Sequence, residues 1–92
     1  MVVCDLLNIP NAVIGELRQR IAEHCRIPAD AIVIGAIHTH GGPSFRSDAY
    51  REFALPRIVE AAAAALADVA PVEALRSGSL ILEPVGFNRR SR

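Results

Sequence analysis

The chain of 92 residues is long enough for one small domain or for part of a larger one. It is 51% hydrophobic but only 4% aromatic, so the core must be built from aliphatic side chains, which favours helices packed on a parallel sheet. Ten basic and ten acidic residues cancel, which argues against nucleic acid or an anionic membrane as a partner.

The first part of the sequence has the pattern of a strand, a helix and a second strand. Residues 2–7 form a short apolar run typical of a buried strand. Asn8 as a capping side chain and Pro10 with its fixed φ predict the start of a helix over residues 12–25. Residues 31–37 are apolar throughout, as in a parallel strand covered on both faces. Together these segments predict a βαβ unit. The apolar side of the helix is formed by Val13, Ile14, Leu17, Ile21 and Cys25.

The second part begins with a loop over residues 38–46, followed by a second predicted helix. Ser47 is its expected cap, and the helix runs to about Val69, with a kink or restart at Pro56. Two short apolar stretches, residues 72–75 and 80–82, predict further strand. The expected fold is therefore α/β, of β-α-β-α-β order, with a mainly parallel sheet and two amphipathic helices. The expected apolar face of the second helix consists of Phe53, Ile58, Ala62, Ala65, Leu66 and Val69.

The residues with the clearest chemical signal are His38-Thr39-His40, which follow directly after the second predicted strand. Residues two apart in an extended chain face the same way, so two imidazoles are expected side by side. The carboxyl ends of strands are where ligands collect in α/β sheets, and imidazole suits Zn, Fe, Ni or Cu. Two histidines are fewer ligands than a zinc site usually takes, and a polar loop is the alternative interpretation.

Residues 34–43, with the sequence IGAIHTHGGP, resemble the THTHSGP signature of neutral, non-lysosomal ceramidases and their bacterial relatives. Two further features agree in order: an apolar strand containing Asp5 before the motif, and an Asn88-Arg89 pair after the second helix. The resemblance thus covers nearly the whole chain. Ile37 and Gly41 stand where the signature has Thr and Ser.

The resemblance implies a zinc-dependent amidohydrolase that splits the N-acyl bond of ceramide-like lipids. It implies that His38 is a zinc ligand, that His40 lies beside the metal and contacts the scissile amide or its oxyanion, and that Arg89 helps to hold the same oxygen. The family's other zinc ligands and its nucleophilic Ser come from segments further along the chain. Residues 1–92 are therefore expected to be part of a larger catalytic domain, inactive alone and prone to self-association through uncovered faces.

Two other functions stay open. One is a metal-dependent hydrolase on a β/α barrel, in which both histidines of a His-x-His motif bind metal, and the other is a truncated product without catalysis. Asp5 is a candidate to orient a ligand histidine, or equally to cap a loop. Cys4 and Cys25 are expected to be free thiols, although a bridge between them is left open.

Overall fold

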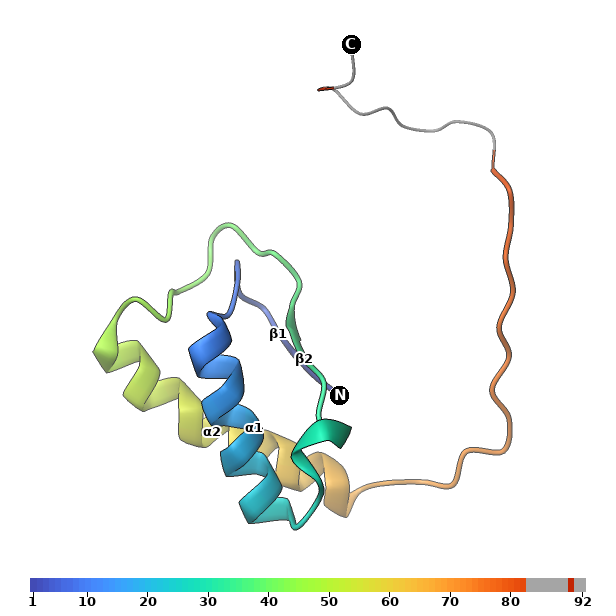
Figure 1. The fold of residues 1–92 in the computed structure, drawn as a ribbon, viewed down its shortest axis with the longest axis horizontal. Helices are drawn as coiled ribbons and strands as arrows, with labels where there is room; N and C mark the ends of the chain where they lie inside the picture. The colour runs from blue at the N-terminus through green and yellow to red at the C-terminus, as the bar shows by residue number, and fades with distance from the viewer. Residues whose placement is uncertain (83–89, 91–92) are drawn as a thin grey trace.

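The structure is a computed structural model that describes residues 1–82 and Arg90. Figure 1 shows two strands on one side, two helices packed against them, and an extended segment that leads away from the second helix. In chain order the elements are β1 (Val2–Cys4), α1 (Asn11–Cys25), the 3-10 turn η1 (Ala29–Ala31), β2 (Ile34–Ala36) and α2 (Asp48–Ala67).

The two strands pair in parallel, as the sequence predicts. Val3 lies opposite Gly35 in the ladder. The pairing continues past β2, because the Ile37 N–H donates to the Cys4 carbonyl at 3.2 Å and the Thr39 N–H donates to the Leu6 carbonyl at 3.1 Å. The predicted βαβ unit and the α/β class are therefore confirmed, and the ladder carries the chain directly into the histidine motif.

Both helices cover the same face of this small sheet. Ile32 and Ile34 are buried beneath them, whereas Val33 and Ile37 on the opposite face are 56% and 57% exposed. The described residues cover this strand on one face only, since both helices pack on the same side, and the expectation of an uncovered apolar face is confirmed. The core consists of Leu6, Ile9, Val13, Leu17, Ile21, Ile32, Ile34, Phe45, Ala54, Leu55 and Val59.

Helix α1 buries the predicted side but begins differently from the prediction. Pro10 occupies the cap position, and its carbonyl accepts a hydrogen bond from the Ile14 N–H at 3.0 Å. Within residues 1–82 no side chain caps this helix, so the expected role of Asn8 is wrong. The Arg18 guanidinium donates from Nε to the Ile32 carbonyl at 2.9 Å, which fixes α1 against the entry to β2.

Helix α2 is capped as predicted and runs without a break. The Ser47 Oγ accepts a hydrogen bond from the Tyr50 N–H at 3.3 Å. The expected restart at Pro56 is wrong, because α2 is one helix through this residue. Leu55 is buried against the core, and the Arg57 guanidinium donates to the Phe53 carbonyl at 2.8 Å. This accepting carbonyl lies one turn before Arg57, next to the Glu52 carbonyl, which loses its usual helical partner because Pro56 has no N–H.

The buried side of α2 overlaps the predicted one only in part. Ile58 and Ala62 pack against the core, as predicted. Ala54, Leu55 and Val59 are the buried residues, whereas Phe53 and Val69 are exposed. The Ala-rich composition of α2 gives a weak apolar contrast around the helix, so contact with α1 and β1 decides which side is buried. Phe53 is left at the surface, with the Arg57 guanidinium 3.8 Å above its ring centroid.

The expected strand after α2 is not formed within residues 1–82. Residues 69–82 are neither helix nor strand, and their large apolar side chains are exposed. Figure 1 shows this segment running apart from the sheet, where it has no backbone partner to complete a ladder. The described order is β-α-β-α, and the two short strands predicted over residues 72–75 and 80–82 are wrong. The exposed side chains of this segment are Val69, Val72, Leu75, Leu80, Ile81 and Leu82.

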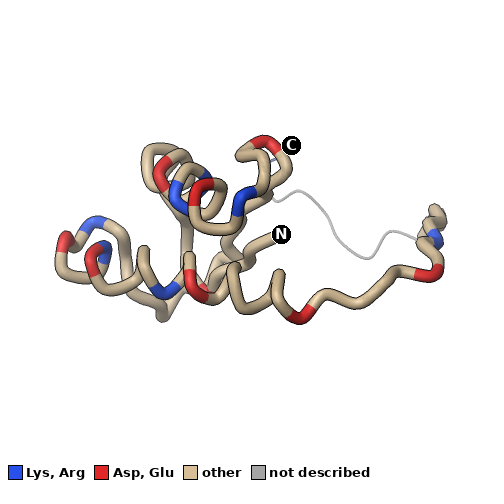
Figure 2. The backbone as a smooth tube through the Cα atoms, turned by 90° about the horizontal axis from the view of Figure 1, so that it is seen from below, with Lys and Arg blue, Asp and Glu red and all other residues tan. Residues whose placement is uncertain are grey.

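Charged residues of both signs are interspersed along the described backbone, as Figure 2 shows. Among the described residues, a cluster of charges joins the two helices: Glu16 of α1 pairs with Arg20 at 2.7 Å and with Arg51 of α2. The hydrogen bond from Arg51 is the main cause that lowers the pKa of the Glu16 carboxyl. This cluster ties α1 to α2 on the side away from the sheet.

Candidate metal site

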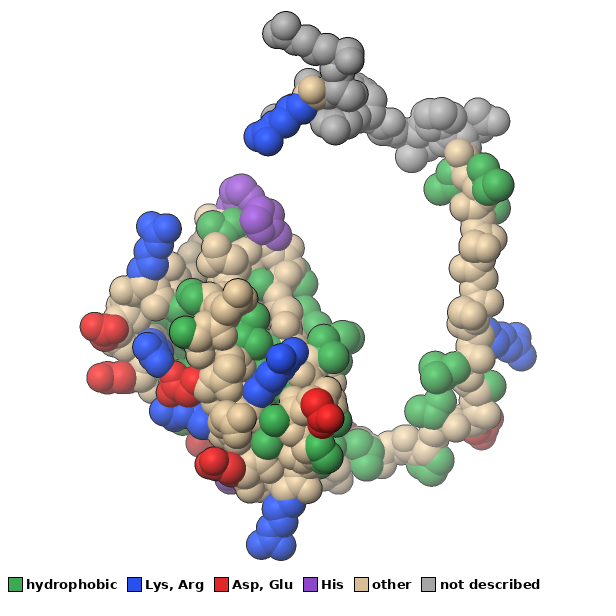
Figure 3. All heavy atoms as spheres, in the orientation of Figure 1, with side chains coloured by type: hydrophobic (Ala, Val, Ile, Leu, Met, Phe, Trp, Pro, Cys, Tyr) green, Lys and Arg blue, Asp and Glu red, His purple; other side chains and the backbone are tan. Residues whose placement is uncertain are grey.

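The histidine motif stands at the carboxyl end of the sheet. β2 ends at Ala36, and the Thr39 N–H keeps the following residues hydrogen-bonded to Leu6 beyond the end of β1. His38 and His40 are both exposed, and Figure 3 shows a pair of histidine side chains at the rim of the described body. The expected position at the end of the second strand is confirmed.

The His38 ring is fixed by a backbone carbonyl far away in the sequence. Its Nδ1 lies 2.9 Å from the Leu7 oxygen, across a separation of 31 residues. A carbonyl oxygen only accepts, so Nδ1 donates and carries the proton of the neutral ring. Nε2 then keeps its lone pair and faces away from this bond. Metal-binding histidines are held in the same way, with one ring N–H bonded to a carbonyl or carboxylate.

The backbone of His38 is part of the same arrangement. Its φ is 67°, in the left-handed region that residues with side chains seldom adopt, although His tolerates it better than most. Such a conformation persists where surrounding contacts enforce it. Here the contacts are the Leu7 bond on one side and the Thr39 bond to Leu6 on the other.

His40 lies next to His38, as predicted, although the extended backbone on which that prediction rested is not formed, because the φ of His38 is 67°. Their ring centroids are 4.9 Å apart, and the rings meet edge to face at 83°. Thr39 between them is half-buried, and its N–H is bonded to the Leu6 carbonyl. The two imidazoles therefore share one small, solvent-facing area.

Gly42 brings the following loop close against β1. A Cβ at this position would lie 3.0 Å from the Asp5 carbonyl oxygen, so any other residue would push the loop away from the strand. A Cβ on Gly41 meets nothing within 4 Å. The sequence alone does not distinguish these two glycines, and the structure assigns the close approach to Gly42.

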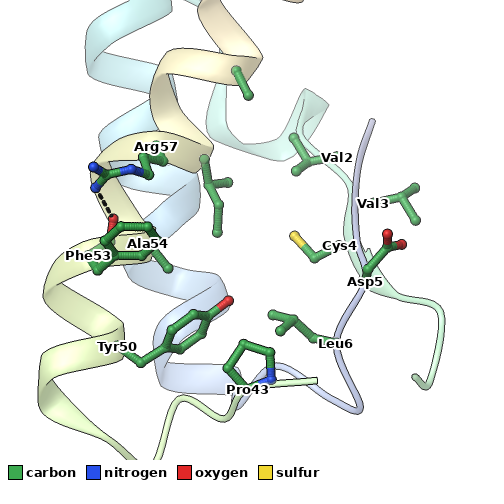
Figure 4. A pocket seen from close by; sticks show the side chains of 12 residues that line it. Val2, Val3, Cys4, Asp5, Leu6, Pro43, Tyr50, Phe53, Ala54 and Arg57 are labelled. Atoms are coloured by element: carbon green, nitrogen blue, oxygen red, sulfur yellow. Dashed lines mark hydrogen bonds between the residues drawn. The ribbon is translucent and has the colours of Figure 1, made fainter. Parts of the chain in front are cut away.

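Asp5 does not take the orienting role considered for it. Among residues 1–82, no hydrogen bond joins its carboxylate to either histidine, and its side chain points away from the helices in Figure 4. The Leu7 carbonyl orients His38 instead. The sequence carries no signal for this partner, because a main-chain carbonyl is present at every position and only the course of the loop selects one.

The described residues supply only part of a zinc ligand set. Across residues 1–82 and Arg90, no three His, Cys, Asp or Glu side chains converge in the geometry of a metal site. The available donors are two adjacent imidazoles, one of them already oriented through Nδ1, and these fit one or two positions of a zinc centre. Asn88 and Arg89 lie outside the described residues.

The two cysteines differ in role from the histidine pair. Cys4 and Cys25 are both half-buried free thiols, which confirms the preferred expectation and rules out the bridge in this structure. Burial, and to a smaller extent the charge of Asp5, raise the pKa of the Cys4 thiol. Cys4 is therefore a poor thiolate donor at neutral pH.

Comparison with known proteins leaves the function open. No protein-family profile, no curated protein and no solved structure matches this chain. In the described part of the chain, neither helix is long and apolar enough to cross a membrane.

Proposed function

We propose that this chain is part of a zinc-dependent amidohydrolase that resembles neutral ceramidase and cleaves the N-acyl amide bond of ceramide-like lipids. The observation that carries the proposal is the bond from His38 Nδ1 to the Leu7 carbonyl, which leaves Nε2 available at the carboxyl end of the sheet. The sequence around the motif supports the same assignment, through the likeness of residues 34–43 to the ceramidase signature.

Each residue has a distinct role in this proposal. His38 would hold the metal through Nε2, and His40 would stay beside it and donate to the carbonyl oxygen of the substrate. Bound zinc supplies Lewis acidity and a water that ionises near neutral pH. Arg89 would add fixed positive charge at the same oxygen as negative charge develops there. The remaining ligands would come from outside the described residues.

The second candidate is a metal-dependent hydrolase in which both histidines bind the ion, as at the end of a β/α-barrel strand. The distance of 4.9 Å between the ring centroids favours it, because two imidazoles this close can reach one metal after a small rotation. The two candidates differ in what His40 does, and this difference can be measured.

Zinc titration of the purified chain separates them. Competition against a chromophoric chelator should reveal a weak site that His38→Ala weakens at least tenfold. His24→Ala is the matched control, because His24 lies in the last turn of α1 and should leave binding unchanged. If His40→Ala also leaves zinc binding unchanged, the first candidate is supported. An equal loss from His38→Ala and His40→Ala supports the second, and a loss from neither refutes both.

Activity should require more than residues 1–92. We expect this chain alone to release no fatty acid from a fluorescent ceramide analogue, with or without zinc, because its described residues supply too few ligands and no positioned nucleophile. In a longer protein that supplies both, Arg89→Ala should lower turnover by about 100- to 1,000-fold with zinc content intact. Arg92→Ala, three positions on, should have little effect, and similar small effects from both substitutions would remove Arg89 from the site.

A further inference from the structure

An apolar groove runs between β1 and α2, on the edge of the sheet away from β2 (Figure 4). Its volume is about 330 Å³. Cys4 and Leu6 form one wall, and Tyr50, Ala54 and Ile58 form the other. Burial in this wall is the main cause that raises the pKa of the Tyr50 hydroxyl, and the charge interaction with the nearby Cys4 raises it further.

The floor of the groove is the free edge of β1. Alternate residues of a parallel strand turn their backbone groups toward opposite neighbours. The Val2 N–H donates to the Val33 carbonyl at 2.8 Å, and the Cys4 carbonyl accepts from the Ile37 N–H at 3.2 Å, so both residues face the β2 side. The N–H groups of Val3 and Asp5 therefore face the groove. An apolar wall beside unpaired strand donors is the arrangement that accepts an added strand.

The same chain contains a segment with the properties of such a strand. Leu80, Ile81 and Leu82 are 79%, 99% and 64% exposed in the extended stretch after α2. Three consecutive large apolar side chains are less favourable in water than in a buried position. The groove and the segment thus each leave apolar surface uncovered that the other would bury.

The direction of the chain favours docking between two copies over docking within one. The end of α2 lies near the start of β1, because Leu66 and Val69 line a hollow together with Met1. A strand that followed α2 directly would therefore run parallel to β1 and β2. Both helices lie on the same face of the sheet, so two crossover connections of the same handedness move the chain across the sheet in the same direction. The connection through α1 leads from β1 to β2. A connection of the same handedness through α2 would place the next strand on the far side of β2, not beside β1.

We infer that the free edge of β1 binds residues 80–82 of a second copy of this chain, in a dimer in which each copy docks on the other. The residues between Ala67 and Leu80 can span up to about 40 Å when extended, which is sufficient to reach a neighbouring molecule. Because each copy would place its residues 80–82 on the other copy, the assembly would be complete with two copies.

Light scattering and sedimentation of the full chain test this inference. The wild type should be a dimer, and Ile81→Asp should weaken it at least tenfold, whereas Val69→Asp makes the same change outside the docked residues and should not. Val3→Pro removes an N–H that faces the groove without touching the β2 ladder, and should weaken the dimer as well. Ala36→Pro makes that change on the other edge of the sheet and is the control.

Mixing the two defective variants gives the sharpest result. Ile81→Asp keeps an intact groove and Val3→Pro keeps an intact segment, so the mixture should regain a heterodimer with one of its two contacts. Circular dichroism checks that each variant keeps its helices. A monomeric wild type at several hundred micromolar would overturn the inference. A dimer that neither variant weakens, or hydrogen-exchange protection of residues 80–82 in a monomer, would also overturn it.

Discussion

His38 donates from Nδ1 to the carbonyl oxygen of Leu7 at 2.9 Å, and so joins the loop after β2 to the loop after β1. The bond selects one of the two neutral ring forms, since only a protonated Nδ1 can donate. Nitrogen NMR of the histidine-labelled chain, at a pH where the ring is neutral, should find the His38 proton on Nδ1. A proton on Nε2 would mean that the Leu7 bond is absent in solution.

Gly42→Ala should disturb the site more than Gly41→Ala. The new Cβ would meet the Asp5 carbonyl at 3.0 Å, so the loop must move away from β1, whereas at Gly41 there is open space. Overpacking of this kind destabilises by about 1 to 3 kcal/mol. Urea unfolding should reveal that loss for Gly42→Ala, with a weaker Nδ1–H signal from His38. Equal behaviour of the two variants would contradict the assigned close approach.

Ser47→Ala should destabilise the chain by about 1 kcal/mol. The Ser47 Oγ accepts the hydrogen bond from the Tyr50 N–H at the start of α2, and Ala leaves that donor to water. Thermal unfolding followed by helical dichroism measures the change. Ser77→Ala, in the extended segment, is the matched control and should leave the midpoint unchanged. A midpoint equally unaffected in both variants would show that the cap contributes nothing.

Glu16 should make stability depend on pH in the acid range. Its pKa is lowered in the folded chain, mainly by the hydrogen bond from Arg51, so its contribution is present above its unfolded pKa of about 4.3 and is lost as the pH falls through the folded value. Glu16→Gln should therefore be less stable than the wild type near pH 7, and the difference should shrink toward pH 3. Glu73→Gln on the extended segment should match the wild type throughout. A difference that persists at low pH would argue against the charge as its source.

The local pattern of the sequence predicts the elements that depend on near neighbours. The spacing of Val13, Leu17 and Ile21 predicts the buried side of α1, and Ser47 predicts the start of α2. Both signals are carried within a few residues. The parallel pairing of β1 with β2 follows as well, because a strand, a helix and a second strand in so short a stretch have few alternatives.

Features that depend on distant contacts could not be predicted in the same way. Pro56 stays inside α2 because Leu55, directly before it, is buried in the core, and that contact has no local signature. The apolar pattern of residues 80–82 is typical of a strand, yet the described chain leaves them exposed because no neighbouring strand pairs with them. The position of the histidine pair was predictable, whereas the Leu7 carbonyl behind it was not.

The most direct test of the account is the His38 Nε2 resonance during addition of zinc to the full chain. Coordination through Nε2 should shift this resonance strongly and saturate with one zinc per chain, while the proton on Nδ1 stays in place. His24 should not change over the same titration. A His38 Nε2 resonance that remains unshifted at saturating zinc, or zinc binding that proceeds equally in His38→Ala, would contradict the assignment of His38 as a metal ligand.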